Sequence, residues 1–168
     1  MKTLSITLEM PKITENKVEA KLAAYYRSQD CVVLRQASFS CKRIDIVKRE
    51  KNDEKVAAIE IKLRDWQGGF RQAKLNAIAC DQSYVAIWHQ YSTPALNNRK
   101  MFEDTGIGLM VIGDGFIPKI EIESSGSPPS PVVRSYFCSN NLRLEGFYKK
   151  RTRSSKLEGR KGKLLEVW

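Results

Sequence analysis

Two neighbouring apolar stretches, separated by a charged run, most constrain how this chain folds. Residues 43–47 alternate polar and apolar side chains, which is the period of a half-buried β-strand. Residues 48–55 are all polar and contain Asn52-Asp53, a dipeptide typical of a hairpin turn. Residues 56–63 have the pattern of a second, more apolar strand. The sequence therefore predicts a β-hairpin over residues 43–63.

Three charged side chains fall on this predicted hairpin. Glu60 and Lys62 are two residues apart, so they point to the same face of their strand, and Asp45 lies on the neighbouring strand. Two carboxylates and an amine seldom converge on a strand face without a partner, because burying unpaired charge is costly. A hard divalent cation satisfies the carboxylates, and a phosphate satisfies the amine. The pattern favours a site for a metal ion and a phosphate.

The order of these residues resembles that of the PD-(D/E)xK nuclease superfamily, which includes restriction endonucleases and archaeal Holliday-junction resolvases. The matching residues, in chain order, are Asp45, Glu60, Ile61, Lys62, Gln72 and Ala73. Glu19 lies in a preceding predicted helix, where many members carry another acid. The pattern spans residues 13–112. Ile44 departs from it, because the family motif has proline before the aspartate.

The resemblance implies a metal-dependent enzyme that hydrolyses DNA phosphodiester bonds. Asp45, Glu60 and the backbone carbonyl of Ile61 would hold Mg²⁺ or Mn²⁺. The metal acidifies a bound water and neutralises charge on the scissile phosphate. Lys62 would orient or deprotonate the attacking water, or stabilise the charged transition state. These four residues form the core of the implied catalytic site.

Further residues join this site by the same resemblance. Glu19 would hold a metal-bound water or a second ion, and it borders the apolar stripe of its helix. Glu15, four residues earlier on the same side, is the competing candidate. Gln72 would orient Lys62 or the DNA backbone. The alternatives are a solvated helix acid for Glu19 and a surface amide for Gln72.

The implied fold is α/β, a restriction-endonuclease-like core in which a central mixed β-sheet is flanked by helices. The periodicity predicts helices over residues 14–28, 70–80 and 93–103, and strands over 1–10, 31–35, 38–47, 56–63, 83–88, 106–112 and 116–123. Residues 124–131 are rich in Ser and Pro and are typical of a linker. We therefore expect a nuclease-like domain over residues 1–123, followed by a linker and basic C-terminal extension over residues 124–168.

The net charge of +10 favours a polyanionic partner, most simply nucleic acid. Residues 132–168 hold ten of the 29 Lys and Arg residues but only three of the 19 acids. The candidate DNA-binding residues are Arg43, Arg71, Lys74, Lys149, Lys150, Arg151 and Arg153. The alternative for the tail is a solvated basic terminus. We expect double-stranded or branched DNA as the partner.

The remaining composition narrows the chemistry and the cellular context. The four cysteines form no CxxC pair, so the spacing of a zinc site is absent. His89 is the only histidine, which excludes a metal centre with two histidines. No apolar run approaches the length of a membrane span, and the N-terminal residues lack a secretory pattern. We therefore expect a cytoplasmic protein with no membrane partner.

Several functions fit these patterns. The small size and basic surface favour a structure-selective endonuclease of the junction-resolvase or repair type. The alternatives are a restriction-type, sequence-specific endonuclease and a catalytically silent DNA-binding protein with the nuclease fold. A purely structural nucleic-acid protein would need only the basic tail. Because cutting two strands usually requires two active sites, we also expect a homodimer.

Overall fold

The computed structural model describes residues 13–39, 42–50, 52 and 55–133. In chain order the elements are α1 (Glu15–Ser28), β1 (Cys31–Phe39), β2 (Lys42–Glu50), β3 (Val56–Lys62), α2 (Trp66–Asn76), β4 (Gln82–Trp88), the 3-10 helix η1 (His89–Tyr91), α3 (Thr93–Leu96), α4 (Arg99–Thr105), β5 (Gly108–Ile112) and β6 (Pro118–Ile122). The strand expected over residues 1–10 and the basic tail lie outside the described residues.

The six strands form one mixed sheet in the order β1-β2-β3-β4-β5-β6. The pairs β1/β2 and β2/β3 are antiparallel, β3/β4 and β4/β5 are parallel, and β5/β6 is antiparallel. Parallel neighbours need a crossover, which α2 supplies for the first pair and α3 with α4 supplies for the second. As a result, the carboxyl ends of β3, β4 and β5 lie at the same edge of the sheet.

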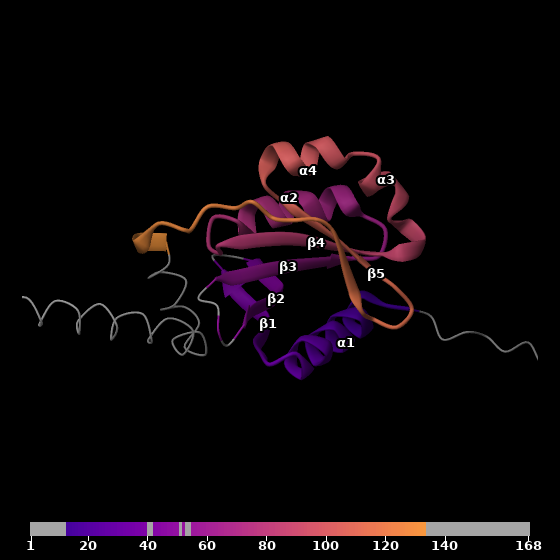
Figure 1. The fold of residues 1–168 in the computed structure, drawn as a ribbon, viewed down its shortest axis with the longest axis horizontal. Helices are drawn as coiled ribbons and strands as arrows, with labels where there is room; N and C mark the ends of the chain where they lie inside the picture. The colour runs from indigo at the N-terminus through magenta and orange to yellow at the C-terminus, as the bar shows by residue number, and fades with distance from the viewer. Residues whose placement is uncertain (1–12, 40–41, 51, 53–54, 134–168) are drawn as a thin grey trace, which may run out of the picture.

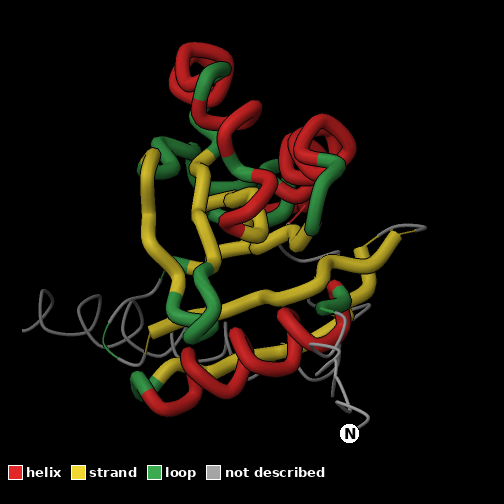
Figure 2. Tube along the Cα trace, turned by 90° about the vertical axis from the view of Figure 1, so that its right-hand side faces the viewer, coloured by secondary structure: helices red, strands yellow, loops and turns green. Residues whose placement is uncertain are grey.

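Helices cover both faces of this sheet, with α1 on one side and α2, α3 and α4 on the other (Figures 1 and 2). On the α1 side, Leu22 belongs to the same buried cluster as Ile59 of β3. On the opposite side, Phe70 of α2 and Phe102 of α4 pack with their ring centroids 4.9 Å apart, in a cluster with Val85. The expected α/β architecture, a central mixed sheet flanked by helices, is confirmed.

The first helix and the central strand follow the sequence pattern closely. The side chain of Thr14 accepts a hydrogen bond from the backbone N–H of Lys17, which caps the start of α1. β4 lies between β3 and β5, and its residues from Ser83 to Trp88 are buried. An unbroken apolar run of this kind is typical of a parallel strand covered on both faces.

α2 begins at Trp66, although the sequence pattern placed its start at Phe70 and read the preceding residues as a turn. The side chain of Asp65 accepts a hydrogen bond from the N–H of Gly68 at 2.8 Å and so caps the helix. Glycine disfavours a helix interior, which misled the sequence interpretation. Here a Cβ on Gly69 would lie 2.9 Å from Cγ of Lys62, so the glycine lets α2 approach β3.

Two other predicted boundaries are wrong. Residues 38–47 are not one strand, because β1 ends at Phe39 and β2 begins at Lys42, and the two strands pair antiparallel. The helix expected over residues 93–103 is divided into α3 and α4. The side chain of Asn98 lies between these two helices and donates to the carbonyl of Pro94, closing the first one. Side-chain hydrogen bonds of this kind leave no periodic trace in a sequence.

The segment that begins the predicted linker is attached to the sheet. Ser124 is buried, and its hydroxyl accepts a hydrogen bond from the N–H of Ser83 and donates one to the carbonyl of Gly106. The N–H of Ser125 donates to the same carbonyl. Residues 134–168, which contain most of the predicted basic extension, lie outside the described residues.

Candidate functional site

The candidate site forms where β2 and β3 stop pairing. Their antiparallel ladder runs from Arg49↔Val56 to Ile46↔Ile59. At the next position, the Oδ2 atom of Asp45 accepts a hydrogen bond from the backbone N–H of Ile61 at 2.8 Å. A side chain therefore replaces the backbone pairing at this point. This hydrogen bond holds the Asp45 carboxylate beside β3, as the predicted hairpin had placed it.

Glu60 and Lys62 lie on the same face of β3, as their spacing predicted. The Nζ atom of Lys62 is 2.9 Å from Oε1 of Glu60. Only 2% of the Glu60 side chain and 17% of the Lys62 side chain are exposed. The other carboxylate oxygen of Glu60, Oε2, is buried and has no hydrogen-bond partner among the described residues. A buried acid with an unpaired oxygen is a costly arrangement for an isolated protein.

The surroundings shift the protonation of Glu60 strongly. Burial raises the pKa of Glu60 to about 7, and the negative charge of Asp45 acts in the same direction. The hydrogen bond and charge of Lys62, together with the amide of Asn76, offset part of this shift. Burial also raises the pKa of Asp45, against the opposing effects of the Ile61 N–H and of Lys62. The two acids are therefore electrostatically coupled.

Lys62 is held in its charged form. Burial alone would lower the pKa of Lys62, but the hydrogen bond and charge of Glu60, followed by the charges of Glu15 and Asp45, raise it above its ordinary value. An ammonium group stabilises negative charge and donates hydrogen bonds, but it cannot accept a proton. In the metal-free protein the Lys62 side chain therefore supplies a positive charge and hydrogen-bond donors.

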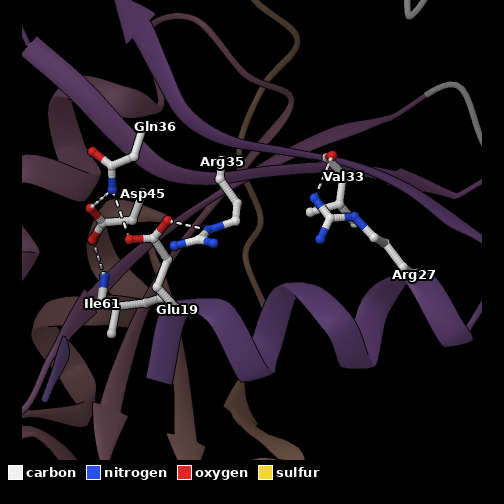
Figure 3. A network of polar contacts seen from close by, with 7 residues as sticks. All are labelled: Glu19, Arg27, Val33, Arg35, Gln36, Asp45 and Ile61. Carbon is white, nitrogen blue, oxygen red and sulfur yellow. Dashed lines mark hydrogen bonds and ion pairs between the residues drawn. The ribbon is translucent and has the colours of Figure 1, made fainter. Parts of the chain in front are cut away.

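Glu19 enters the site from α1 and is held by two residues that the sequence pattern did not single out (Figure 3). The Nε atom of Arg35 donates to Oε1 of Glu19 at 2.7 Å, and Nε2 of Gln36 donates to Oε2 at 2.8 Å. The same Gln36 nitrogen lies 3.2 Å from Oδ1 of Asp45. Gln36 thus connects the helix acid to the strand acid.

The backbone of Gln36 is in an unusual conformation, with φ at 52° inside β1. Its neighbours pair as Arg35↔Ile46 and Ala37↔Ile44, so Gln36 lies opposite Asp45. A positive φ costs a residue other than glycine roughly 1 kcal/mol or more. In this conformation the side-chain amide of Gln36 contacts both Glu19 and Asp45. Glutamine is an ordinary strand-surface residue, so no sequence signal reveals this contact.

The alternative helix acid, Glu15, also reaches this region. Its Oε1 atom accepts a hydrogen bond from the backbone N–H of Leu63 at 3.1 Å. Glu15 is exposed, whereas the side chain of Glu19 is only 4% exposed. The structure therefore brings both acids of α1 to the end of β3, with Glu19 beside Asp45 and Glu15 beside Lys62.

The amide of α2 that acts on Glu60 is that of Asn76, one turn after the predicted Gln72. Asn76 of α2 is buried, and its side-chain amide is close enough to Glu60 to lower the pKa of that acid, although among the described residues Nδ2 of Asn76 does not meet an acceptor in good hydrogen-bond geometry. Gln72 is half-buried, and in the described part of the chain its side chain forms no hydrogen bond to Lys62 or to either acid. The two residues share a helix face, so the sequence could have pointed to either of them.

The predicted DNA-binding residues fall into two groups. Arg43 is exposed on β2, and Arg71 and Lys74 are exposed on α2. Those expected in the tail, Lys149, Lys150, Arg151 and Arg153, lie outside the described residues. Exposure leaves the first three free to contact a ligand.

The donor set fits a hard divalent cation that keeps several of its waters. Asp45 and Glu60 supply carboxylate oxygens, including the unpaired Oε2 of Glu60. Within the described ranges, no three His, Cys, Asp or Glu side chains are grouped closely enough to hold a metal by themselves. Mg²⁺ is commonly bound through one or two carboxylates with water completing its coordination. Ile61, whose backbone carbonyl is the third expected metal ligand, donates a hydrogen bond from its N–H to the Asp45 carboxylate.

Comparison with known proteins gives the fold and no activity. No family model matches the sequence, and no curated protein matches it. One solved structure, the SPO1766 protein of unknown function from Silicibacter pomeroyi, is similar over 93% of this chain and 99% of its own, with a TM-score of 0.57 and 16% sequence identity. Separately, none of the described helices is long and apolar enough to cross a membrane.

Proposed function

We propose that this protein is a metal-dependent endonuclease that hydrolyses DNA phosphodiester bonds on a restriction-endonuclease-like fold. The observation that carries the proposal is the coupling of a buried acid, Glu60, to a half-buried acid, Asp45, beside a charged lysine, Lys62, that contacts Glu60 at 2.9 Å. Two neighbouring acids, one of which has a carboxylate oxygen without a hydrogen-bond partner among the described residues, suit a divalent cation. The neighbouring ammonium group suits the phosphate that such a cation would also contact.

Each residue of the site has a distinct role in this proposal. Asp45 and Glu60 hold Mg²⁺ or Mn²⁺, which supplies an activated water and neutralises phosphate charge when bound. Lys62 stabilises the negative charge that develops on the phosphate oxygens. Glu19 and Gln36 orient Asp45, because the Gln36 amide lies between their carboxylates at 2.8 and 3.2 Å.

The proposal also covers the kind of substrate and the assembly of the enzyme. The net charge of +10 supports a polyanionic substrate. We propose a structure-selective enzyme of the junction-resolvase or repair type, with a restriction-type, sequence-specific enzyme as the alternative. A homodimer would supply the second active site that cutting two strands requires. The competing candidate is a DNA-binding protein that has the fold without the activity.

The experiment that tests the proposal is a cleavage panel with purified protein. Supercoiled plasmid, linear duplex and four-way junction DNA are incubated with Mg²⁺, Mn²⁺, Ca²⁺ or a chelator. Nicking or junction cleavage is expected with Mg²⁺ or Mn²⁺ and not with Ca²⁺ or the chelator. The Asp45→Asn variant, purified in parallel, controls for a contaminating nuclease. Binding of all substrates without cleavage under any metal would identify the protein as the silent DNA-binding alternative.

A further inference from the structure

An arginine two residues after Lys62 contacts an aromatic ring and, among the described residues, no acid. Arg64 is exposed and follows the end of β3, two residues after Lys62. Its Cζ atom lies 4.4 Å from the centroid of the Tyr91 ring, and its Nη2 atom donates to the Tyr91 hydroxyl at 2.7 Å. Stacking and the hydrogen bond together fix the plane of the guanidinium group.

The place of this pair in the fold puts it at the same edge of the sheet as Lys62. Tyr91 ends η1, which directly follows β4. β3 and β4 are parallel, with Lys62 opposite Ile87. Arg64 and Tyr91 therefore both lie beyond the carboxyl ends of neighbouring parallel strands, the edge at which open α/β sheets bind ligands. The Lys62 ammonium group belongs to the same edge.

Two other arginines of the domain are paired with acids, whereas Arg64, in the described part of the chain, is not. Arg35 is neutralised by Glu19 at 2.7 Å, and Arg99 is neutralised by Glu103 at 3.0 Å. Among the described residues no carboxylate pairs with Arg64. A guanidinium group has five N–H donors, and the Tyr91 hydroxyl occupies one of them. Arg64 therefore keeps its full charge and most of its donors for another acceptor.

We propose that Arg64, oriented by Tyr91, binds a backbone phosphate of DNA next to the phosphate that is cleaved. A planar guanidinium group binds phosphate oxygens with two parallel hydrogen bonds. Because the Tyr91 ring already fixes its plane, less conformational entropy is lost when the phosphate arrives. One face of that ring is covered by the arginine, which favours a phosphate over a stacked base as the group bound here.

The proposal rests on the proposed nuclease function, but its test does not depend on cleavage. DNA binding is measured by fluorescence anisotropy of a labelled duplex and a labelled four-way junction, in Ca²⁺ buffer, over a series of salt concentrations. Arg64→Ala is expected to weaken binding about tenfold and to flatten the log–log salt dependence by about 0.9, the loss of one phosphate contact.

Two further variants control this measurement. Arg99→Ala removes one positive charge that is already neutralised by Glu103, so its affinity and salt slope should match wild type. Tyr91→Phe keeps the ring and the charge of Arg64 but removes the hydroxyl acceptor. It should weaken binding only about threefold and leave the salt slope unchanged. Thermal unfolding of each variant checks that the fold is intact.

The outcomes separate the two proposals. Unchanged affinity and slope in Arg64→Ala, or an equal loss in Arg99→Ala, would overturn the phosphate site while leaving the nuclease function untouched. Wild-type protein that binds DNA, loses a contact in Arg64→Ala and yet never cleaves would overturn the nuclease function alone. A saturating cleavage rate that falls in Arg64→Ala with unchanged affinity would make Arg64 a catalytic residue and overturn its role in binding. Wild-type protein that binds no DNA would overturn both.

Discussion

Three strands of the sheet, β2, β3 and β6, carry a glutamate and a lysine two positions apart that form an ion pair. The pairs on β3 and β6 make the closest comparison, since only the first of them belongs to the candidate site. On β3, Nζ of Lys62 is 2.9 Å from Oε1 of Glu60. On β6, Nζ of Lys119 is 2.7 Å from Oε1 of Glu121. In both cases an isoleucine separates the two residues in the sequence. By spacing and by ion-pair distance the two strands are equivalent.

The two ion pairs differ in how deeply they are buried. The Lys62 side chain is 17% exposed and the Glu60 side chain 2%, whereas the values for Lys119 and Glu121 are 76% and 22%. β3 is an interior strand and β6 is an edge strand. An exposed ion pair contributes only about 0–1 kcal/mol, whereas a buried acid depends strongly on each partner it has. The comparison teaches that a glutamate and a lysine two positions apart differ in their surroundings with their position in the sheet, and that on β3 a second acid, Asp45, adjoins the pair.

The largest expected effect is on the rate of DNA cleavage, when the lysine of each pair is replaced in turn. Lys62→Ala should reduce single-turnover DNA cleavage by at least ~100-fold, because it removes a positioned charge-stabilising group. Lys119→Ala removes the equivalent amine from β6 and should cleave within twofold of wild type. Both variants should still bind DNA, as measured by anisotropy. Equal rates for the two variants would mean that the β3 pair is only a charged strand face.

The next effect is on metal binding. Asp45→Asn and Glu60→Gln should each weaken Mg²⁺ or Mn²⁺ binding by about tenfold or more, since metal-site substitutions commonly have effects of this size. Glu121→Gln is the matched control on β6 and should bind metal as wild type does. Isothermal titration calorimetry, with and without DNA, measures the difference. Metal affinity that is identical in all four proteins would place the cation elsewhere or exclude it.

A third prediction concerns stability and pH in the metal-free protein. Glu60 has a folded-state pKa of about 7, above its ordinary value of 4.5, so between these pH values the folded state binds more protons than the unfolded state. The free energy of unfolding should therefore fall as the pH rises from about 4.5 to about 7, by at most about 3 kcal/mol from this group. Glu60→Gln removes this loss.

Urea unfolding at pH 5 and pH 8 measures this effect. Relative to wild type, Glu60→Gln should be more stable at pH 8 than at pH 5, whereas Glu121→Gln should show no comparable change. Added Mg²⁺ should stabilise the wild-type protein at pH 8, because it binds the ionised acids of the folded state. Parallel pH dependences for wild type and Glu60→Gln would contradict the raised pKa of Glu60.

The smallest expected effect concerns the strained residue that joins the acids. Gln36→Gly suits the positive φ of this position, so it should retain or gain about 1 kcal/mol of stability by thermal unfolding. It also removes the amide that contacts Glu19 and Asp45. Metal affinity should therefore fall severalfold although the fold is no weaker. Metal affinity equal to wild type would mean that Gln36 does not position Asp45.

The local pattern of the chain predicted much of the fold. The period-2 alternation over residues 43–47 and the apolar run over 56–63 correctly indicated two antiparallel strands. Thr14 correctly marked the start of α1. The spacing of Glu60 and Lys62 correctly placed them together. These features depend on neighbouring residues in the chain, because hydrophobic periodicity and helix caps act within a few positions of each other.

The rest of the site was decided by contacts between distant segments. Gln36 reaches Glu19 and Asp45 only because β1 pairs with β2 in one register while α1 packs over both. Arg64 meets Tyr91 only because β3 and β4 are parallel neighbours. Amides, arginines and tyrosines are common surface residues, so their spacing carried no signal. The sequence by itself determined the type and order of most strands and helices, but not all of their boundaries. Tertiary packing decided which charges are buried together, since burial and register are properties of the assembled sheet.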